Sequence, residues 1–72
     1  MTRIKVKVRF NSSQQRIEKF GPNMFLMYLE FDKSDDSMEI ISEILARSMG
    51  IPKENVNFAY VDSGSTWIFD LE

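Results

Sequence analysis

Eight consecutive residues near the start of the chain alternate strictly between basic and apolar side chains. Residues 3–10 read Arg-Ile-Lys-Val-Lys-Val-Arg-Phe. Because successive side chains of a β-strand point to opposite faces, this period predicts a strand with one apolar face and one cationic face. The cationic face comprises Arg3, Lys5, Lys7 and Arg9. The apolar face should cover a core, which leaves the cationic face to meet water, carboxylates or phosphates.

The next two segments predict a connection and a second strand. Residues 11–23 are mostly polar and end in Gly-Pro-Asn, which predicts a long connection that closes in a turn, with one helical turn capped by Ser12. Residues 24–31 are apolar on both faces, which is typical of a strand inside a sheet or of one whose second face is covered.

The remaining chain predicts a helix and two further strands. Apolar residues at helical spacing predict a helix over residues 37–49, with Asp36 and Glu39 as a capping-box variant at its start and Gly50 as its stop signal. Residues 56–62 and 66–72 alternate again. The short polar segment 63–65 between them, Ser-Gly-Ser, predicts a hairpin connection.

This order of elements, strand-strand-helix-strand-strand, predicts a single α+β domain over residues 1–72. We expect a two-layer sandwich in which one helix packs on a mainly antiparallel four-stranded sheet. The predicted core comprises Ile4, Val6, Val8, Phe10, Phe25, Met27, Leu29, Phe31, Ile41, Ile44, Leu45, Val56, Phe58, Tyr60, Trp67, Phe69 and Leu71.

Composition excludes several kinds of site. The chain has no cysteine and no histidine, so disulfides, thiolate zinc sites and nucleophile–histidine pairs are excluded. The longest apolar run, residues 24–29, is far too short to span a membrane. We therefore expect a soluble cytoplasmic protein with no metal, no cofactor and no membrane partner. With no plausible base or nucleophile, no catalytic residue is predicted, and we expect no enzyme activity.

Three segments of the chain match a known pattern. The first strand runs into Asn11, Ser12 and then Ile17, and an apolar strand covers residues 24–29. The most specific segment comprises Leu45, Ala46, Arg47, Met49, Gly50, Ile51, Pro52, Lys53 and Val56. In these segments the chain resembles the YggU-like family of small uncharacterised proteins, and the similarity covers nearly its whole length. The resemblance implies a fold and no site residue, because the polar signature residues of that family are replaced here in the loop before the helix and in the segment before the last strand. The element order is also similar to that of β-grasp proteins.

One candidate site is the apolar set that points away from the predicted core. If their strands are neighbours, these residues form a patch that would meet a protein partner or a second copy of the chain. They are Met24, Leu26, Tyr28, Val61 and Ile68. A non-enzymatic interaction or structural module is therefore our leading prediction. The open alternatives are that Ile17 and Phe20 of the connection over residues 11–23 cover the patch, or that the strand registers differ by two residues from those expected.

The second candidate site is the cationic face of the first strand. Arg3, Lys5, Lys7 and Arg9 would bind nucleic acid weakly through its phosphates. Pairing within the sheet is favoured over this reading, because the net charge is −2 and no aromatic residue interrupts the basic stripe. The carboxylates expected to pair with it are Glu30, Asp32, Asp70 and Glu72.

Overall fold

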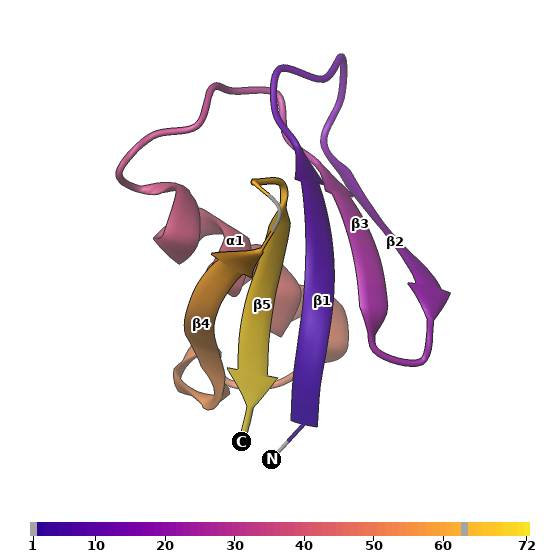
Figure 1. The fold of residues 1–72 in the computed structure, drawn as a ribbon, viewed down its shortest axis with the longest axis vertical. Coiled ribbons are helices and arrows are strands. Elements are labelled where there is room, and N and C mark those ends of the chain that lie inside the picture. The colour runs from indigo at the N-terminus through magenta and orange to yellow at the C-terminus, as the bar shows by residue number, and fades with distance from the viewer. Residues whose placement is uncertain (1, 63) are drawn as a thin grey trace.

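The computed structural model describes residues 2–62 and 64–72, which form a five-stranded sheet and one α-helix. The elements are β1 (Thr2–Arg9), β2 (Arg16–Gly21), β3 (Met24–Tyr28), α1 (Ser37–Met49), the short 3-10 helix η1 (Lys53–Asn55), β4 (Val56–Asp62) and β5 (Thr66–Leu71). The strand order is β2-β3-β1-β5-β4, with β1 at the centre (Figure 1). β1 runs parallel to β3, and the other three pairs are antiparallel.

The α+β class and the packing of one helix on one face of the sheet are confirmed, but the predicted number of strands is wrong. Residues 16–21, expected to be part of a connection, form the edge strand β2, which turns at Pro22 and Asn23 into β3. The strand offers a weak sequence signal because Ile17 is its only apolar residue that packs on the core. The predicted helical turn at Ser12 does not form, since its N–H donates to the Leu29 carbonyl instead.

The bounds of α1 agree with the prediction, although the predicted side-chain cap does not form at its first turn. Asp36 makes no side-chain cap hydrogen bond, so the predicted capping box is wrong. Ser37 is buried, and its hydroxyl accepts a hydrogen bond from the Ser34 N–H at 2.8 Å. At the other end Gly50 adopts the left-handed conformation at φ 68°, as a C-terminal glycine does without steric cost.

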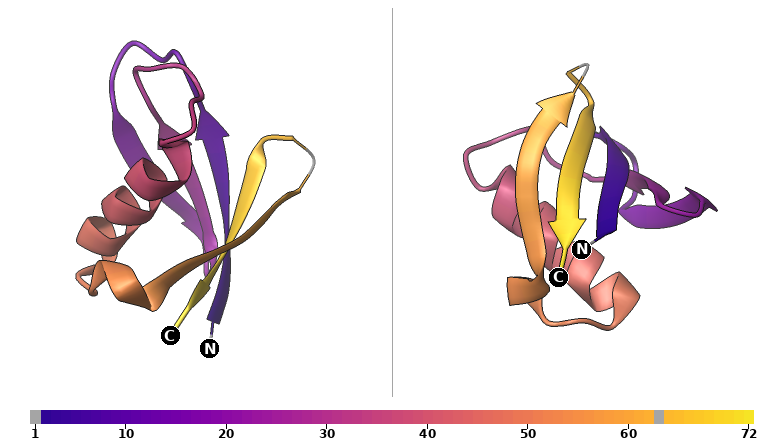
Figure 2. Two further views of the ribbon diagram at one scale, coloured as in Figure 1. Left: turned by 90° about the vertical axis from the view of Figure 1, so that its left-hand side faces the viewer. Right: turned by 60° about the horizontal axis from the view of Figure 1, so that its bottom comes forward.

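The core lies between α1 and one face of the sheet, while the opposite face has no helix on it (Figure 2). All but one of the predicted core residues are buried there or pack against the buried cluster. Ile17, Ala46, Met49 and Ile51 join the core without having been predicted.

Tyr60 is the exception, and a bulge in β4 is the reason. Phe58 pairs with Phe69, but Tyr60 already pairs with Ile68, so one extra residue lies in β4 between them. An extra residue swaps the two faces of a strand beyond that point. The prediction of Tyr60 in the core is therefore wrong, because 48% of its surface is exposed on the face without a helix. Val61, expected on that face, pairs with the core residue Trp67 and shares its face instead.

Candidate functional site

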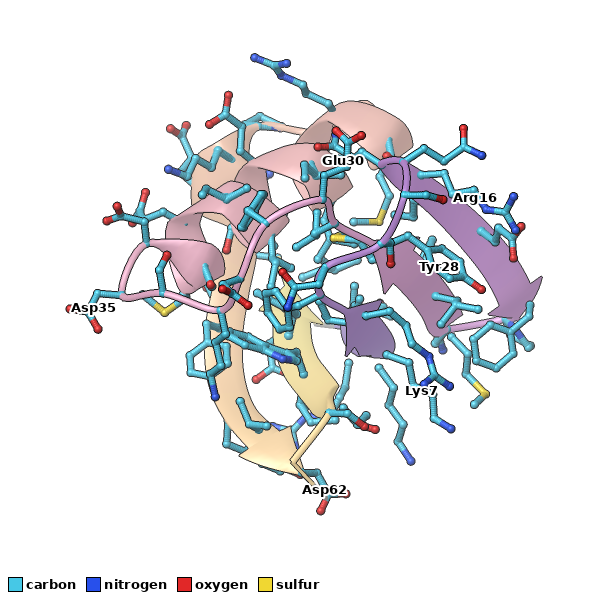
Figure 3. All side chains as sticks on the ribbon, turned by 90° about the horizontal axis from the view of Figure 1, so that it is seen from above. Lys7, Arg16, Tyr28, Glu30, Asp35 and Asp62 are labelled. Atoms are coloured by element: carbon cyan, nitrogen blue, oxygen red, sulfur yellow. The ribbon has the colours of Figure 1, made fainter. Side chains whose placement is uncertain are left out.

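The surface of interest is the face of the sheet opposite α1, hereafter the open face. Figure 3 shows Lys7 pointing away from α1, whereas Glu30 and Asp35 lie on the helix side. The strand registers assign to the open face Arg3, Lys5, Lys7 and Arg9 of β1, Met24, Leu26 and Tyr28 of β3, Arg16 and Glu18 of β2, Thr66, Ile68 and Asp70 of β5, and Asn57, Tyr60 and Asp62 of β4.

The central position of β1 joins the two predicted sites into one surface. Lys5 lies between Met24 on β3 and Ile68 on β5. Lys7 has Leu26 as its β3 neighbour, and Arg9 has Tyr28. The cations therefore form a stripe along the middle of the sheet, and the apolar residues lie beside it rather than in a separate patch.

The five predicted partner-binding residues differ in how much surface they offer. Met24, Leu26 and Tyr28 share β3, and Met24 is 39% exposed while the other two are half-buried. Ile68 lies on the open face as expected but is only 1% exposed. Ile68 is therefore covered by its neighbours and offers almost no area to a partner. Val61 does not lie on the open face, because the bulge in β4 turns it to the core side.

Tyr60 is the residue of the open face that sequence reasoning missed. Simple alternation along β4 placed it with Phe58, and a bulge leaves no clear mark in a single sequence. β5 separates β4 from the first strand, but the side chain of Arg3 reaches Tyr60, with its guanidinium carbon 5.6 Å from the ring centroid. Arg16 makes a similar contact with Tyr28, at 4.9 Å. Each tyrosine of the open face is therefore paired with a guanidinium group.

The predicted pairing of β1 with carboxylates forms at one residue. Arg3 donates to both oxygens of Asp70, from Nε at 2.9 Å and from an Nη at 3.1 Å. Within residues 2–62 and 64–72, Lys5, Lys7 and Arg9 form no ion pair. Among the described residues, three successive cations of the central strand are therefore not held in an ion pair, although the carboxylate of Asp62 lies on the same face, two strands from Lys7.

Charge is unevenly divided between the two sides of the molecule. Eight of the eleven carboxylates lie in α1, η1, the connecting segments and the last residue, away from the open face. The other three lie on the open face, where Glu18 and Asp70 are paired with arginines and Asp62 lies opposite Thr66 at the edge of the sheet, against the five cations Arg3, Lys5, Lys7, Arg9 and Arg16. The open face is therefore cationic although the chain as a whole carries a net charge of −2.

The contact between Arg3 and Asp70 should affect how the Asp70 carboxyl titrates with pH. The hydrogen bond from Arg3, helped by its positive charge, holds the pKa of Asp70 below its usual value, while desolvation opposes this. A carboxyl with a lowered pKa stabilises the fold above its unfolded pKa, and this contribution is lost as pH falls through the folded value. We expect Arg3→Gln to raise the pKa of Asp70, measured by NMR titration of its carboxyl carbon. Arg9→Gln is the control, and an unchanged Asp70 pKa in Arg3→Gln would contradict the assignment.

The helix side carries a mainly apolar cavity. A cavity of about 500 Å³ lies between the end of α1 and the β2–β3 hairpin, and it is lined mainly by apolar residues such as Phe25 and Met49. Lys19 is the one charged residue in its lining, which includes no carboxylate to act as a base. Among the residues that the structure describes, no three acidic side chains gather where they could hold a metal ion.

Comparisons with protein families, with curated proteins and with solved structures find no match to this chain. The resemblance to the YggU-like family therefore stays a prediction. In the described parts of the chain no helix has the length and apolar character needed to cross a bilayer. Fold and surface together define an α+β domain that carries an uncovered, cationic sheet face.

Proposed function

We propose that this chain is a non-enzymatic binding module whose open face holds an anionic partner. The observation that carries the proposal is the stripe of Lys5, Lys7 and Arg9, which lies on the central strand without an ion pair among the described residues. Exposed cations that are not neutralised internally attract polyanions and raise the rate of association. The apolar residues beside the stripe add contact area. Cytoplasmic location and membership of the YggU-like family remain proposals from the sequence.

Charge distinguishes an anionic partner from a second copy of the chain. A two-fold contact uses the same patch on both copies. With β1 at the centre of the sheet, such a contact through the open face would bring the cationic stripes of two copies together, where like charges repel. The predicted homodimer is therefore the less favoured form of the proposal, and a protein partner would need carboxylates to complement the stripe.

Binding of heparin, a polyanion that lacks both bases and amino-acid side chains, tests the proposal. We expect backbone NMR signals of β1, β3 and β5 to shift on titration at low salt. Lys5→Gln/Lys7→Gln should lower the affinity about ten-fold or more, because phosphate-like contacts dominate such binding. Lys33→Gln/Arg47→Gln removes the same charge from outside the open face and should bind nearly as wild type does.

Two results would reject the proposal. Shifts confined to α1 and its flanking loops would place the polyanion on the wrong side of the molecule. Equal losses in the two double variants would show that net charge, and not the stripe on β1, governs binding. Light scattering on the same samples checks whether a second copy occupies the open face, since wild type is expected to be a monomer.

A further inference from the structure

Resting on the proposed function, we propose that the anionic partner is a single-stranded nucleic acid, whose phosphates follow β1 while its bases lie on the tyrosines of β3 and β4. The surface joins three features that such a ligand requires: a line of cations, flat aromatic groups beside it, and an uncovered sheet. Each comes from a different part of the chain, and the fold brings them together.

The cations form a regular line. Alternate residues of a strand are about 6.6 Å apart, so Lys5, Lys7 and Arg9 repeat at even intervals along the middle of the open face. Each nucleotide contributes one phosphate, so a strand laid along β1 meets the cations repeatedly. Because none of the three is held by a carboxylate within the described residues, no internal ion pair must break when a phosphate binds.

Aromatic rings lie on either side of this line. Tyr28 is the β3 neighbour of Arg9, and Tyr60 lies on β4 within 5.6 Å of the Arg3 guanidinium. Arg16 lies over Tyr28 (Figure 3), so a guanidinium accompanies each ring. Bases of single strands stack on aromatic rings and on guanidinium planes, which is how open sheets bind unpaired nucleotides.

These rings distinguish a nucleic acid from an acidic protein segment. Carboxylates would satisfy the lysines equally well, but they make no use of flat tyrosine–arginine pairs at both sides of the stripe. A duplex would also satisfy the cations, yet its bases are stacked on each other and are not free to lie on Tyr28 or Tyr60. The ligand that uses both features is single-stranded.

Two features of the sequence, the net negative charge and the lack of an aromatic residue on the cationic face of the first strand, disfavour nucleic-acid binding when each is considered alone. The net negative charge arises mainly from residues away from the open face. The first strand contains no aromatic residue on its cationic face, but its neighbours on β3 and the nearby edge strand β4 supply Tyr28 and Tyr60. A binding surface whose residues come from several strands cannot be recognised from the sequence of any single strand.

Fluorescence anisotropy on the full chain tests the proposal with four labelled probes: a twelve-nucleotide oligothymidylate, the matching oligouridylate, a blunt duplex of the same length and a polyglutamate peptide. We expect both single strands to bind more tightly than the duplex and the peptide at low salt. With three phosphate contacts the logarithm of affinity should fall with the logarithm of salt concentration with a slope of about −2. Lys5→Gln/Lys7→Gln should reduce this slope by about 1.4.

Tyr28→Leu separates stacking from charge, because it keeps every cation of the open face. We expect a loss of about five-fold or more in affinity for the single strands, and little change for polyglutamate or heparin. Thermal denaturation followed by circular dichroism verifies that each variant is folded. Tyr60→Leu, at the other side of the stripe, provides a second measurement should Tyr28→Leu fail to fold.

The outcomes separate this proposal from the binding function on which it rests. Binding of polyglutamate or of duplex as tight as that of the single strands, or single-strand binding unchanged in both tyrosine variants, overturns the nucleic-acid assignment while the anionic-partner function stands. Failure of heparin and of all four probes to bind at low salt overturns both.

Discussion

Replacement of Phe69 by alanine is expected to lower the free energy of unfolding by about 3–5 kcal/mol. Phe69 is fully buried in β5, next to the central strand, where it pairs with Ile4 on one side and Phe58 on the other. Its ring packs edge-to-face on that of Phe58, with 5.6 Å between the centroids. Because small domains are stable by only about 5–15 kcal/mol, this loss removes a large part of the margin.

Urea denaturation followed by the fluorescence of Trp67 measures the effect, since Trp67 is 4% exposed and becomes solvated on unfolding. Tyr60→Ala is the matched control, as it removes an aromatic ring that is about half exposed on the open face. We expect the control to be clearly less damaging. Phe69→Leu keeps most of the apolar volume and allows the measurement if Phe69→Ala does not fold. Equal losses for Phe69→Ala and Tyr60→Ala would contradict the assignment of faces.

Replacement of Leu45 by alanine is expected to cost about 2–5 kcal/mol. Leu45 is fully buried at the centre of the contact between α1 and the sheet. Alanine has a higher intrinsic helix propensity than leucine, so the change in propensity by itself would stabilise the variant slightly. The destabilisation therefore reports only on packing between the two layers.

Met38→Ala, on the same helix but 40% exposed, serves as the control and should change stability by less than about 1 kcal/mol. Helical circular dichroism during urea denaturation measures both variants. A similar midpoint for the two would mean that α1 does not pack on the sheet through the face that carries Leu45.

Local patterns predict most of the elements because local sterics create them. The alternation in residues 3–10 corresponds to β1, and Gly50 ends α1 at the expected position because only glycine enters the left-handed region without strain. The strand β2 could not be predicted from the sequence, since most of its residues are polar or exposed. Ile17 is its only residue that packs on the core, and one apolar residue cannot define an alternating pattern. The bulge in β4 could not be predicted either, because it is defined by the register of β4 with β5 and not by the residues of β4 alone.

The sequence by itself determined which side chains of the first strand share a face, where the helix begins and ends, and that the chain has no cysteine and no histidine. Only the tertiary structure decided what lies beside the cations. Strand order depends on contacts between residues far apart in the chain, which no local pattern records. By placing β1 between β3 and β5, the fold leaves Lys5, Lys7 and Arg9 without an ion pair among the described residues and brings Tyr28 beside Arg9.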